Sequence, residues 1–215
     1  MSDATYIDYS TVEEAKRKLE VDVTNKVLHL IYTKAWEGDA PWVEFYYVID
    51  RLEHGPEPET LVELGESAGV DRNEIYQAWN RLSKRERKEV MLDIKDAIAS
   101  VGTVILMDEL VDDISRLTST INDIDERRRV LVDVLDKAYQ FVDRKISFDE
   151  LISYIANLLS PLKRNRDPES YKKAVALGKY LAHYSGKESL EFFVYDVFIK
   201  RLERKLGKYA GIHED

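Results

Sequence analysis

The sequence predicts an all-α protein of about ten helices. Throughout its 215 residues, apolar side chains recur three and four positions apart, the spacing that places them on one face of a helix. Residues that favour helix starts precede most of these stretches. No segment alternates between apolar and polar residues strongly enough to predict a strand. These observations together indicate helices packed on one another, without a sheet.

Two long helices are expected first. Ser10 and Glu13 form a capping-box pattern at the start of one helix, and Gly38 ends it. Its inner face is expected to contain Val12, Ala15, Leu19, Val23, Val27 and Ile31. Asp39 and Pro41 open the second helix, since proline fits the first helical turn. Its buried stripe should consist of Trp42, Phe45, Val48, Ile49 and Leu52.

Glycines divide the next part of the chain. The residues 59–68 and 71–82 form two short helices separated by Gly69. Ser83 opens a helix that we expect to end at Gly102, followed by another helix over 103–120. One face of that helix is crowded with carboxylates, which we expect to be solvated: Asp108, Glu109, Asp112 and Asp113.

Three more helix starts are marked by oxygen-bearing caps: Asp123 with Glu126, Ser147 with Glu150, and Asp167 before Pro168. The last helix, roughly 187–206, is apolar on several sides, which predicts a central position or pairing with another subunit. Its apolar residues are Leu190, Phe193, Val194, Val197, Phe198 and Leu202.

The preferred division is an N-terminal helical region over 1–102 and a C-terminal helical bundle over 103–215. Proline-containing stretches at 54–58 and 161–170 are the other candidate boundaries.

Composition excludes several functional classes. Cysteine is absent, which rules out thiol catalysis, zinc ribbons and disulfide frameworks.

The first ten residues lack the pattern of a secretory signal, and no apolar run reaches the roughly 18 residues of a membrane span, so we expect a cytoplasmic protein. The high charge content with only two glutamines is typical of a thermophile. A net charge of -9 means that any contact with DNA must be local.

In one segment, Leu61 to Leu82, the spacing of the residues is typical of a functional motif. Leu64 and Ala68 would face inward, Gly69 would supply a left-handed turn, and Val70 would fill the corner. Asp71 with Glu74 would cap the second helix, which buries Ile75, Ala78 or Trp79, and Leu82. This pattern resembles the helix-turn-helix of DNA-binding proteins, a motif class and not a particular family. The resemblance covers some 22 residues and implies a tri- or tetra-helical unit without a wing.

The outward face of the second helix is the candidate DNA-binding site. Its side chains can pair with base edges or phosphates. With two cations that follow, the candidate set over 59–85 is Arg72, Asn73, Tyr76, Gln77, Asn80, Arg81, Lys84 and Arg85. From 71 to 88 six cations stand against three carboxylates, so this segment is positive within a negative protein.

Three observations oppose this interpretation. Glu57, Glu59, Glu63 and Glu66 make the first helix and its approach acidic, and carboxylates near phosphates weaken binding. Gly65 occupies a position where such motifs usually carry alanine, and glycine inside a helix costs about 1 kcal/mol. The same spacing also arises in ordinary helical hairpins.

The other sequence patterns indicate a function less strongly than this segment does. The four histidines, His29, His54, His183 and His213, have no metal-ligand spacing, and no nucleotide-binding glycine motif or nucleophile elbow occurs. The acidic pairs, Asp112 with Asp113 and Asp123 with Asp125, lack a calcium-loop pattern. The C-terminal cations complement a helix dipole better than they suit phosphate contacts: Lys200, Arg201, Arg204, Lys205 and Lys208.

The leading hypothesis is a nonenzymatic DNA-binding or transcription-associated protein, without a cofactor or metal, that contacts double-stranded DNA. The C-terminal bundle would mediate homodimerisation or contact a protein partner. The alternative is a helical interaction or scaffold protein in which the motif only contributes packing. An enzyme with an unrecognised site ranks third.

Overall fold

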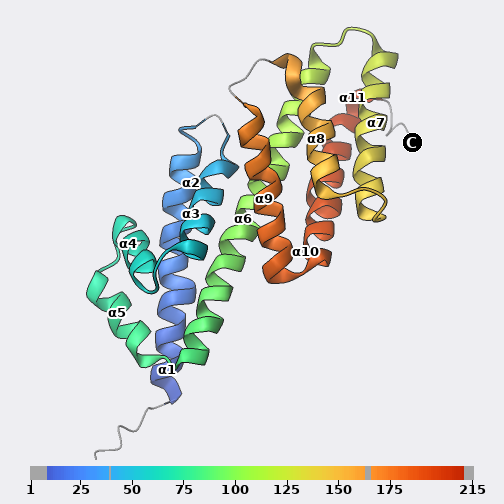
Figure 1. Ribbon diagram of the computed structural model, residues 1–215. Coiled ribbons are helices and arrows are strands. Elements are labelled where there is room, and N and C mark those ends of the chain that lie inside the picture. Colours follow the sequence, from blue (N-terminus) through green and yellow to red (C-terminus); the bar gives the residue numbers. More distant parts are fainter. Residues whose placement is uncertain (1–8, 39, 163–165, 211–215) are drawn as a thin grey trace, which may run out of the picture.

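The computed structural model describes residues 9–38, 40–162 and 166–210, apart from the side chains of 9, 10 and 206–210, and every regular element in these residues is helical. Consecutive segments join into nine continuous helices within these ranges, which confirms the predicted all-α fold. Figure 1 shows one long helix, α6, running diagonally between two groups of shorter helices.

The first group comprises α1 (Tyr9–Arg17), η1 (Lys18–Val23), α2 (Thr24–Ala35), α3 (Trp42–His54), α4 (Glu59–Ser67) and α5 (Arg72–Arg81). The central helix is α6 (Lys84–Ser119). The second group comprises α7 (Ile124–Val142), α8 (Phe148–Leu159), η2 (Ser160–Leu162), α9 (Pro168–Ser185), α10 (Lys187–Phe192), η3 (Phe193–Ile199) and α11 (Lys200–Ala210). The segments η1 and η3 are π-helical and η2 is a single 3₁₀ turn.

Helix starts follow the predicted caps. The Ser83 hydroxyl accepts from the backbone N–H of Glu86 at 3.3 Å, and the Glu86 carboxylate accepts from the N–H of Ser83 at 2.7 Å. Ser147 and Glu150 form the same capping box at the start of α8. Asp123 and Asp167 cap α7 and α9. The predicted caps at Ser10 and Asp39 fall on groups outside the described part of the structure.

The predicted helix end at Gly102 is wrong. Helix α6 continues through this residue, which lies where α3 and α9 cross it. A methyl group on Gly102 would lie 2.6 Å from Cβ of Phe45 and 3.1 Å from Cδ2 of Leu177. The glycine therefore allows a close helix–helix approach and does not terminate a helix. The predicted division between 102 and 103 consequently falls inside a continuous helix.

The π-helical segments explain a four-residue repeat in two helices. From Ala15 to Ala35 the buried residues recur every fourth position, and Leu190, Val194, Phe198 and Leu202 repeat in the same way. In an α-helix each four-residue step turns about 40° beyond a full circle, so such a stripe would drift away from the core. One wider π turn corrects this drift. The hydroxyl of Thr24, the first residue of α2, donates to the Leu19 carbonyl of η1 at 2.9 Å.

The segment η1 also brings two carboxyl groups together. Glu20 is half-buried and shares a hydrogen bond with Asp93 of α6, near Lys16 and Glu89. Burial, followed by the hydrogen bond and the charge of Asp93, raises the pKa of Glu20 from 4.5 to about 7. The pair thus retains a proton near neutral pH where η1 and α6 pack.

Replacing Gly102 by alanine should lower the free energy of unfolding by about 1–2 kcal/mol, because overpacking against Phe45 outweighs the gain in helix propensity. Urea unfolding followed by circular dichroism measures this difference. Gly38→Ala is the control, because the atom nearest to the methyl group added there, the Ala35 carbonyl oxygen, is 3.9 Å away. A Gly102→Ala protein as stable as the parent would contradict the close-approach explanation.

Glu20→Gln should reduce the pH dependence of stability. A carboxyl group whose pKa is raised by folding stabilises the fold at low pH, and this contribution is lost as pH rises from about 4.5 to about 7. The parent should therefore show a larger drop in Tm between pH 5 and pH 8 than Glu20→Gln does. The exposed Glu14→Gln on α1 serves as the matched control. Equal drops in all three proteins would rule out the Glu20–Asp93 pair as the cause.

Candidate nucleic-acid interface

Helices α4 and α5 meet at a tight turn on the outer side of the first group (Figure 1). Gly69 has a φ of 88°, the left-handed conformation predicted for it, and no atom would crowd a side chain there. Val70 is buried, and its N–H donates to the Gly65 carbonyl at 2.9 Å. The turn therefore satisfies its own backbone groups while it fills the corner.

The predicted buried face of this unit is confirmed. Ile75 is fully buried, and the other core residues of the pair are Leu64, Ala78, Trp79 and Leu82. Gly65, which the sequence marked as less favourable than alanine, lies directly against Ile75. A methyl group at position 65 would overlap the Ile75 side chain, so glycine lets α4 and α5 pack closely.

The cap of α5 differs in part from the prediction. The Asp71 carboxylate accepts from the N–H of Asn73 at 2.7 Å, as an N-cap should. Glu74 takes no part in the cap in this structure and instead forms an ion pair with Lys18 of η1 at 2.8 Å. That ion pair links the exposed end of α5 to the N-terminal helix.

The candidate residues mostly lie on one exposed surface. Tyr76 is half-buried and packs against the core edge, whereas the other seven are exposed: Arg72, Asn73, Gln77, Asn80, Arg81, Lys84 and Arg85. Arg85 is paired with Glu89 at 3.0 Å. In the described part of the chain, Arg72, Arg81 and Lys84 have no carboxylate within ion-pair distance. These three cations are available to an anionic partner.

The carboxylates of α4 are also exposed. Glu59, Glu63 and Glu66 lie on its outer side, and Glu63 pairs with Arg51 of α3 at 3.1 Å. That pair holds one of the three charges toward α3.

The acidic face of α6 is solvated only in part, contrary to the prediction, since Asp108 and Asp112 are half-exposed and the other two carboxylates are not. Asp113 and Glu109 are buried, and Arg166 pairs with both of them, at 2.5 Å for Glu109. The Arg166 side chain is only 4% exposed, and its guanidinium lies 4.8 Å from the ring centre of Trp42. Buried carboxylates require such partners because isolated charges are costly in the interior.

The C-terminal cations pair with the same face of α6. Arg201 pairs with Asp108, and Lys205 pairs with Asp112. Lys200 pairs with Asp196 within its own helix at 2.5 Å. Arg201 and Lys205 therefore join α11 to α6, a role that the helix-dipole interpretation did not include. Lys208 has a side chain outside the described part of the structure.

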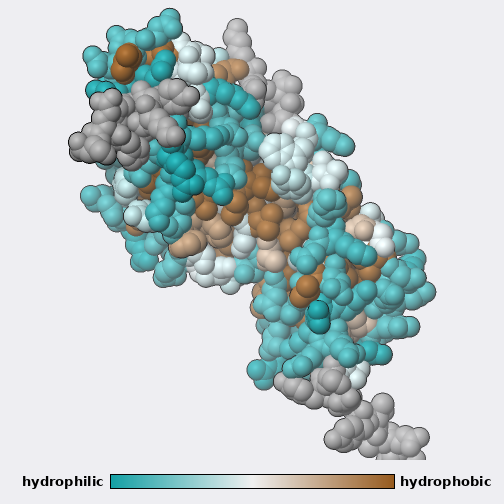
Figure 2. Space-filling view, turned by 180° about the vertical axis from the view of Figure 1, so that it is seen from behind, coloured by the Kyte–Doolittle hydropathy of each residue, from teal (hydrophilic) through white to brown (hydrophobic). Residues whose placement is uncertain are grey.

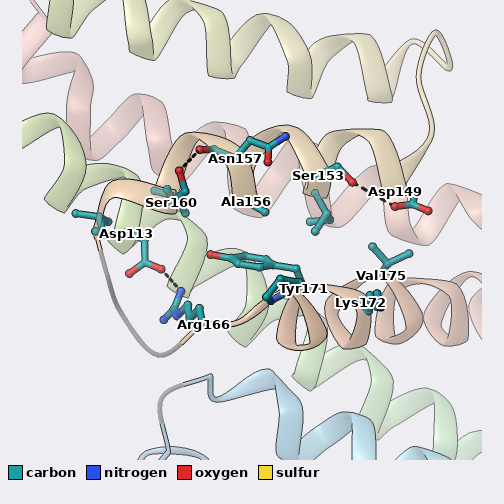
Figure 3. Close-up of a pocket in the computed structure, with 14 residues that line it drawn as sticks. Asp113, Asp149, Ser153, Ala156, Asn157, Ser160, Arg166, Tyr171, Lys172 and Val175 are labelled. Carbon is teal, nitrogen blue, oxygen red and sulfur yellow. Dashed lines mark hydrogen bonds and ion pairs between the residues drawn. The ribbon is translucent and has the colours of Figure 1, made fainter.

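A cavity of about 670 Å³ opens beside the Arg166 ion pairs, between α8 and α9. Figure 3 shows Tyr171 across this space, with Asp113 and Arg166 at one end and Asp149 at the other. Burial raises the pKa of Tyr171. Ile152, Ala156 and Val175 make the wall largely apolar. Sequence reasoning missed this region, since Arg166 lies 53 residues from Asp113 and no local pattern marks their meeting.

Among the described residues, no group of three or more histidines and carboxylates is arranged to hold a metal ion. Asp123 is occupied in capping α7, and Asp112 and Asp113 are held in ion pairs. These carboxylates therefore have structural roles.

Comparisons with protein-family models, with curated protein sequences and with solved structures give no match. Within the described ranges, no helix combines the length and the apolar character that crossing a bilayer requires.

Arg166→Met should be strongly destabilising, by about 3–5 kcal/mol, because it removes the cation paired with the buried Glu109 and leaves the buried Asp113 to the longer, 3.4 Å ion pair with Arg116. Urea unfolding at pH 7 measures the loss. The triple variant Arg166→Met, Glu109→Gln, Asp113→Asn removes all three charges and should regain most of the stability. A single variant that loses less than about 1 kcal/mol would show that the ion pairs are dispensable.

Proposed function

We propose that this protein is a non-catalytic, transcription-associated DNA-binding protein that places α5 in the major groove of double-stranded DNA. The observation that carries the proposal is the exposed polar face of α5, held by a tight turn and flanked by three cations without carboxylate partners among the described residues. Helix-turn-helix proteins read DNA with such a face, while the preceding helix braces it.

The roles of the side chains follow from their chemistry. Asn73 and Gln77 are four residues apart, so they share one face of α5 and can each form two hydrogen bonds with an adenine edge. Arg72 and Arg81 can contact guanine or phosphate from the two ends of the helix. Tyr76, half-buried beside them, would contact the backbone or position its neighbours.

Charge distribution limits the contact to this surface. The net charge of -9 repels DNA at long range, and the exposed carboxylates of α4 add to that repulsion. Binding would therefore show a strong dependence on salt and would be confined to the α5 side of the molecule.

The second candidate function is a helical protein-interaction protein. Trp36 is 56% exposed and forms an edge-to-face pair with Tyr32 at 5.6 Å between ring centres. Both rings line a cavity of about 510 Å³ with Ile105 and Arg204. Figure 2 shows the molecule from behind, with an apolar area in the middle of this rear face. Exposed aromatic residues of this kind anchor protein interfaces, including homodimers.

Titration with duplex DNA at low and moderate salt tests the proposal. The parent should bind at low salt, and the triple variant Arg72→Ala, Arg81→Ala, Lys84→Ala should lose affinity and salt dependence together, because phosphate contacts release counterions. Asn73→Ala with Gln77→Ala should instead reduce discrimination among sequences, by about 1–3 kcal/mol per lost bidentate contact.

Two results would overturn the proposal: no binding by the parent at low salt, or a triple variant with unchanged affinity and unchanged salt slope. Circular dichroism of each variant provides the folding control, since the replaced cations are exposed.

A further inference from the structure

A second feature lies next to the α5 surface. The end of α5 and the first three turns of α6 enclose a groove of about 480 Å³. Trp79 and Met91 form its buried floor, and Leu92 lies at its edge, 41% exposed. The polar lining is dominated by cations, namely Lys84, Arg87, Lys88 and Lys95, with Glu57 as the one carboxylate that lines it among the described residues.

The cations of this groove differ in how they are held. Lys95 is buried and pairs with Glu53 at 3.4 Å. The Arg87 Nε–H donates to the Trp79 carbonyl at 3.0 Å, and its guanidinium lies 5.3 Å from the centre of the Trp79 ring. Lys84 and Lys88 are exposed and have no carboxylate within ion-pair distance in the described part of the chain. Lys95 and Arg87 are thus held by groups of the protein, whereas Lys84 and Lys88 are available to a ligand.

The carboxylates of the same turns are directed elsewhere. Glu86 is held by the backbone N–H of Ser83 in the capping box. Glu89 contacts Arg85 at 3.0 Å and Lys16 of α1 at 3.5 Å. The start of α6 therefore presents cations toward the groove, whereas Glu86 is held at Ser83 and Glu89 is directed toward Lys16 of α1. This separation gives the groove a local charge opposite to that of the whole protein.

The groove borders the α5 surface at Lys84, which belongs to both. Trp79 contributes from α5, and Asn80 and Arg81 lie between it and the start of α6. Lys84 and Lys88 are one turn apart, about 6 Å along the helix. A DNA strand that passed the exposed face of α5 would next meet these two ammonium groups.

We infer that this groove binds the phosphodiester backbone of the DNA whose bases face α5, with Lys84 and Lys88 as the phosphate-contacting residues and Arg87 as a positioning residue. The inference rests on the proposed function. It adds a second contact region, beyond α5 itself, and fixes where the backbone crosses the protein. An acidic peptide is the competing occupant, and DNA is favoured because the groove adjoins a face of hydrogen-bonding side chains.

The experiment measures duplex affinity as a function of salt for the full chain and for Lys84→Gln with Lys88→Gln. Each phosphate contact contributes about 0.9 to the log–log salt slope, so the double variant should lower the slope by about 1.8. The corresponding loss of affinity at 0.1 M salt is roughly 60-fold. Lys179→Gln with Lys187→Gln is the matched control, because both lysines are exposed on α9 and α10 and the charge change is equal.

A gain-of-binding variant separates this effect from damage to the fold. Glu57→Gln removes the carboxylate that lines the groove and should strengthen duplex binding by about two- to fivefold. Asp133→Asn, an exposed residue of α7, should leave binding unchanged. Loss of structure could not produce tighter binding.

The outcomes are distinct. A slope unchanged by the double variant, in a protein that still requires Arg72 and Asn73 for DNA binding, overturns the groove inference and leaves the proposed function standing. Weaker binding of polyglutamate with unchanged binding of duplex assigns the groove to an acidic peptide and also overturns the inference. Absence of duplex binding by the parent at low salt overturns the proposed function and, with it, the DNA backbone as the occupant.

Discussion

The backbone of α6 passes so close to α3 and α9 that only a glycine fits between them. At Gly102 the side chains of Phe45 and Leu177 occupy the space that any Cβ would need. This crossing holds the first group of helices against the second, because α3 contacts both α6 and α9 there. Helices α4 and α5 are connected to this crossing through their neighbours, since α4 packs on α2 and α3 and α5 packs on α1 and η1.

Charge pairing completes the arrangement. The carboxylates on the second half of α6 pair with three cations from two later parts of the chain, Arg166 before α9 and Arg201 and Lys205 in α11. These cations are consequently unavailable to a ligand. At the other end of the same helix Lys84 and Lys88 have no such pairs in the described residues. A protein with a large negative net charge thereby retains a small cationic surface beside α5.

Local signals explain which features the sequence could predict. The capping residues Ser83 and Ser147, the turn at Gly69 and the buried stripe of α5 depend on neighbours within a few positions, so their patterns are visible in the chain. The exposed face with Asn73 and Gln77 follows from the same periodicity. These parts of the fold and of the candidate site are therefore predictable from the sequence alone.

The remaining features depend on residues that are distant in sequence. Gly102 has the same local appearance as a helix-ending glycine, and only Phe45 and Leu177 reveal its role. The acidic face of α6 has a solvated pattern, yet Lys205 reaches Asp112 across 93 residues. The groove combines Glu57 with Trp79 and Lys88, which no periodicity connects. The four-residue spacing of the first helix is visible in the sequence. The π turn that this spacing requires is not evident when a regular α-helix is assumed.

The uninterrupted course of α6 has a mechanical consequence. A break at Gly102 would have created a hinge, whereas 36 continuous residues make a strut about 54 Å long. The strut begins beside the groove and ends at Ser119 in the second group of helices. Because the helix is continuous, a partner bound at its far end would set the orientation of α5.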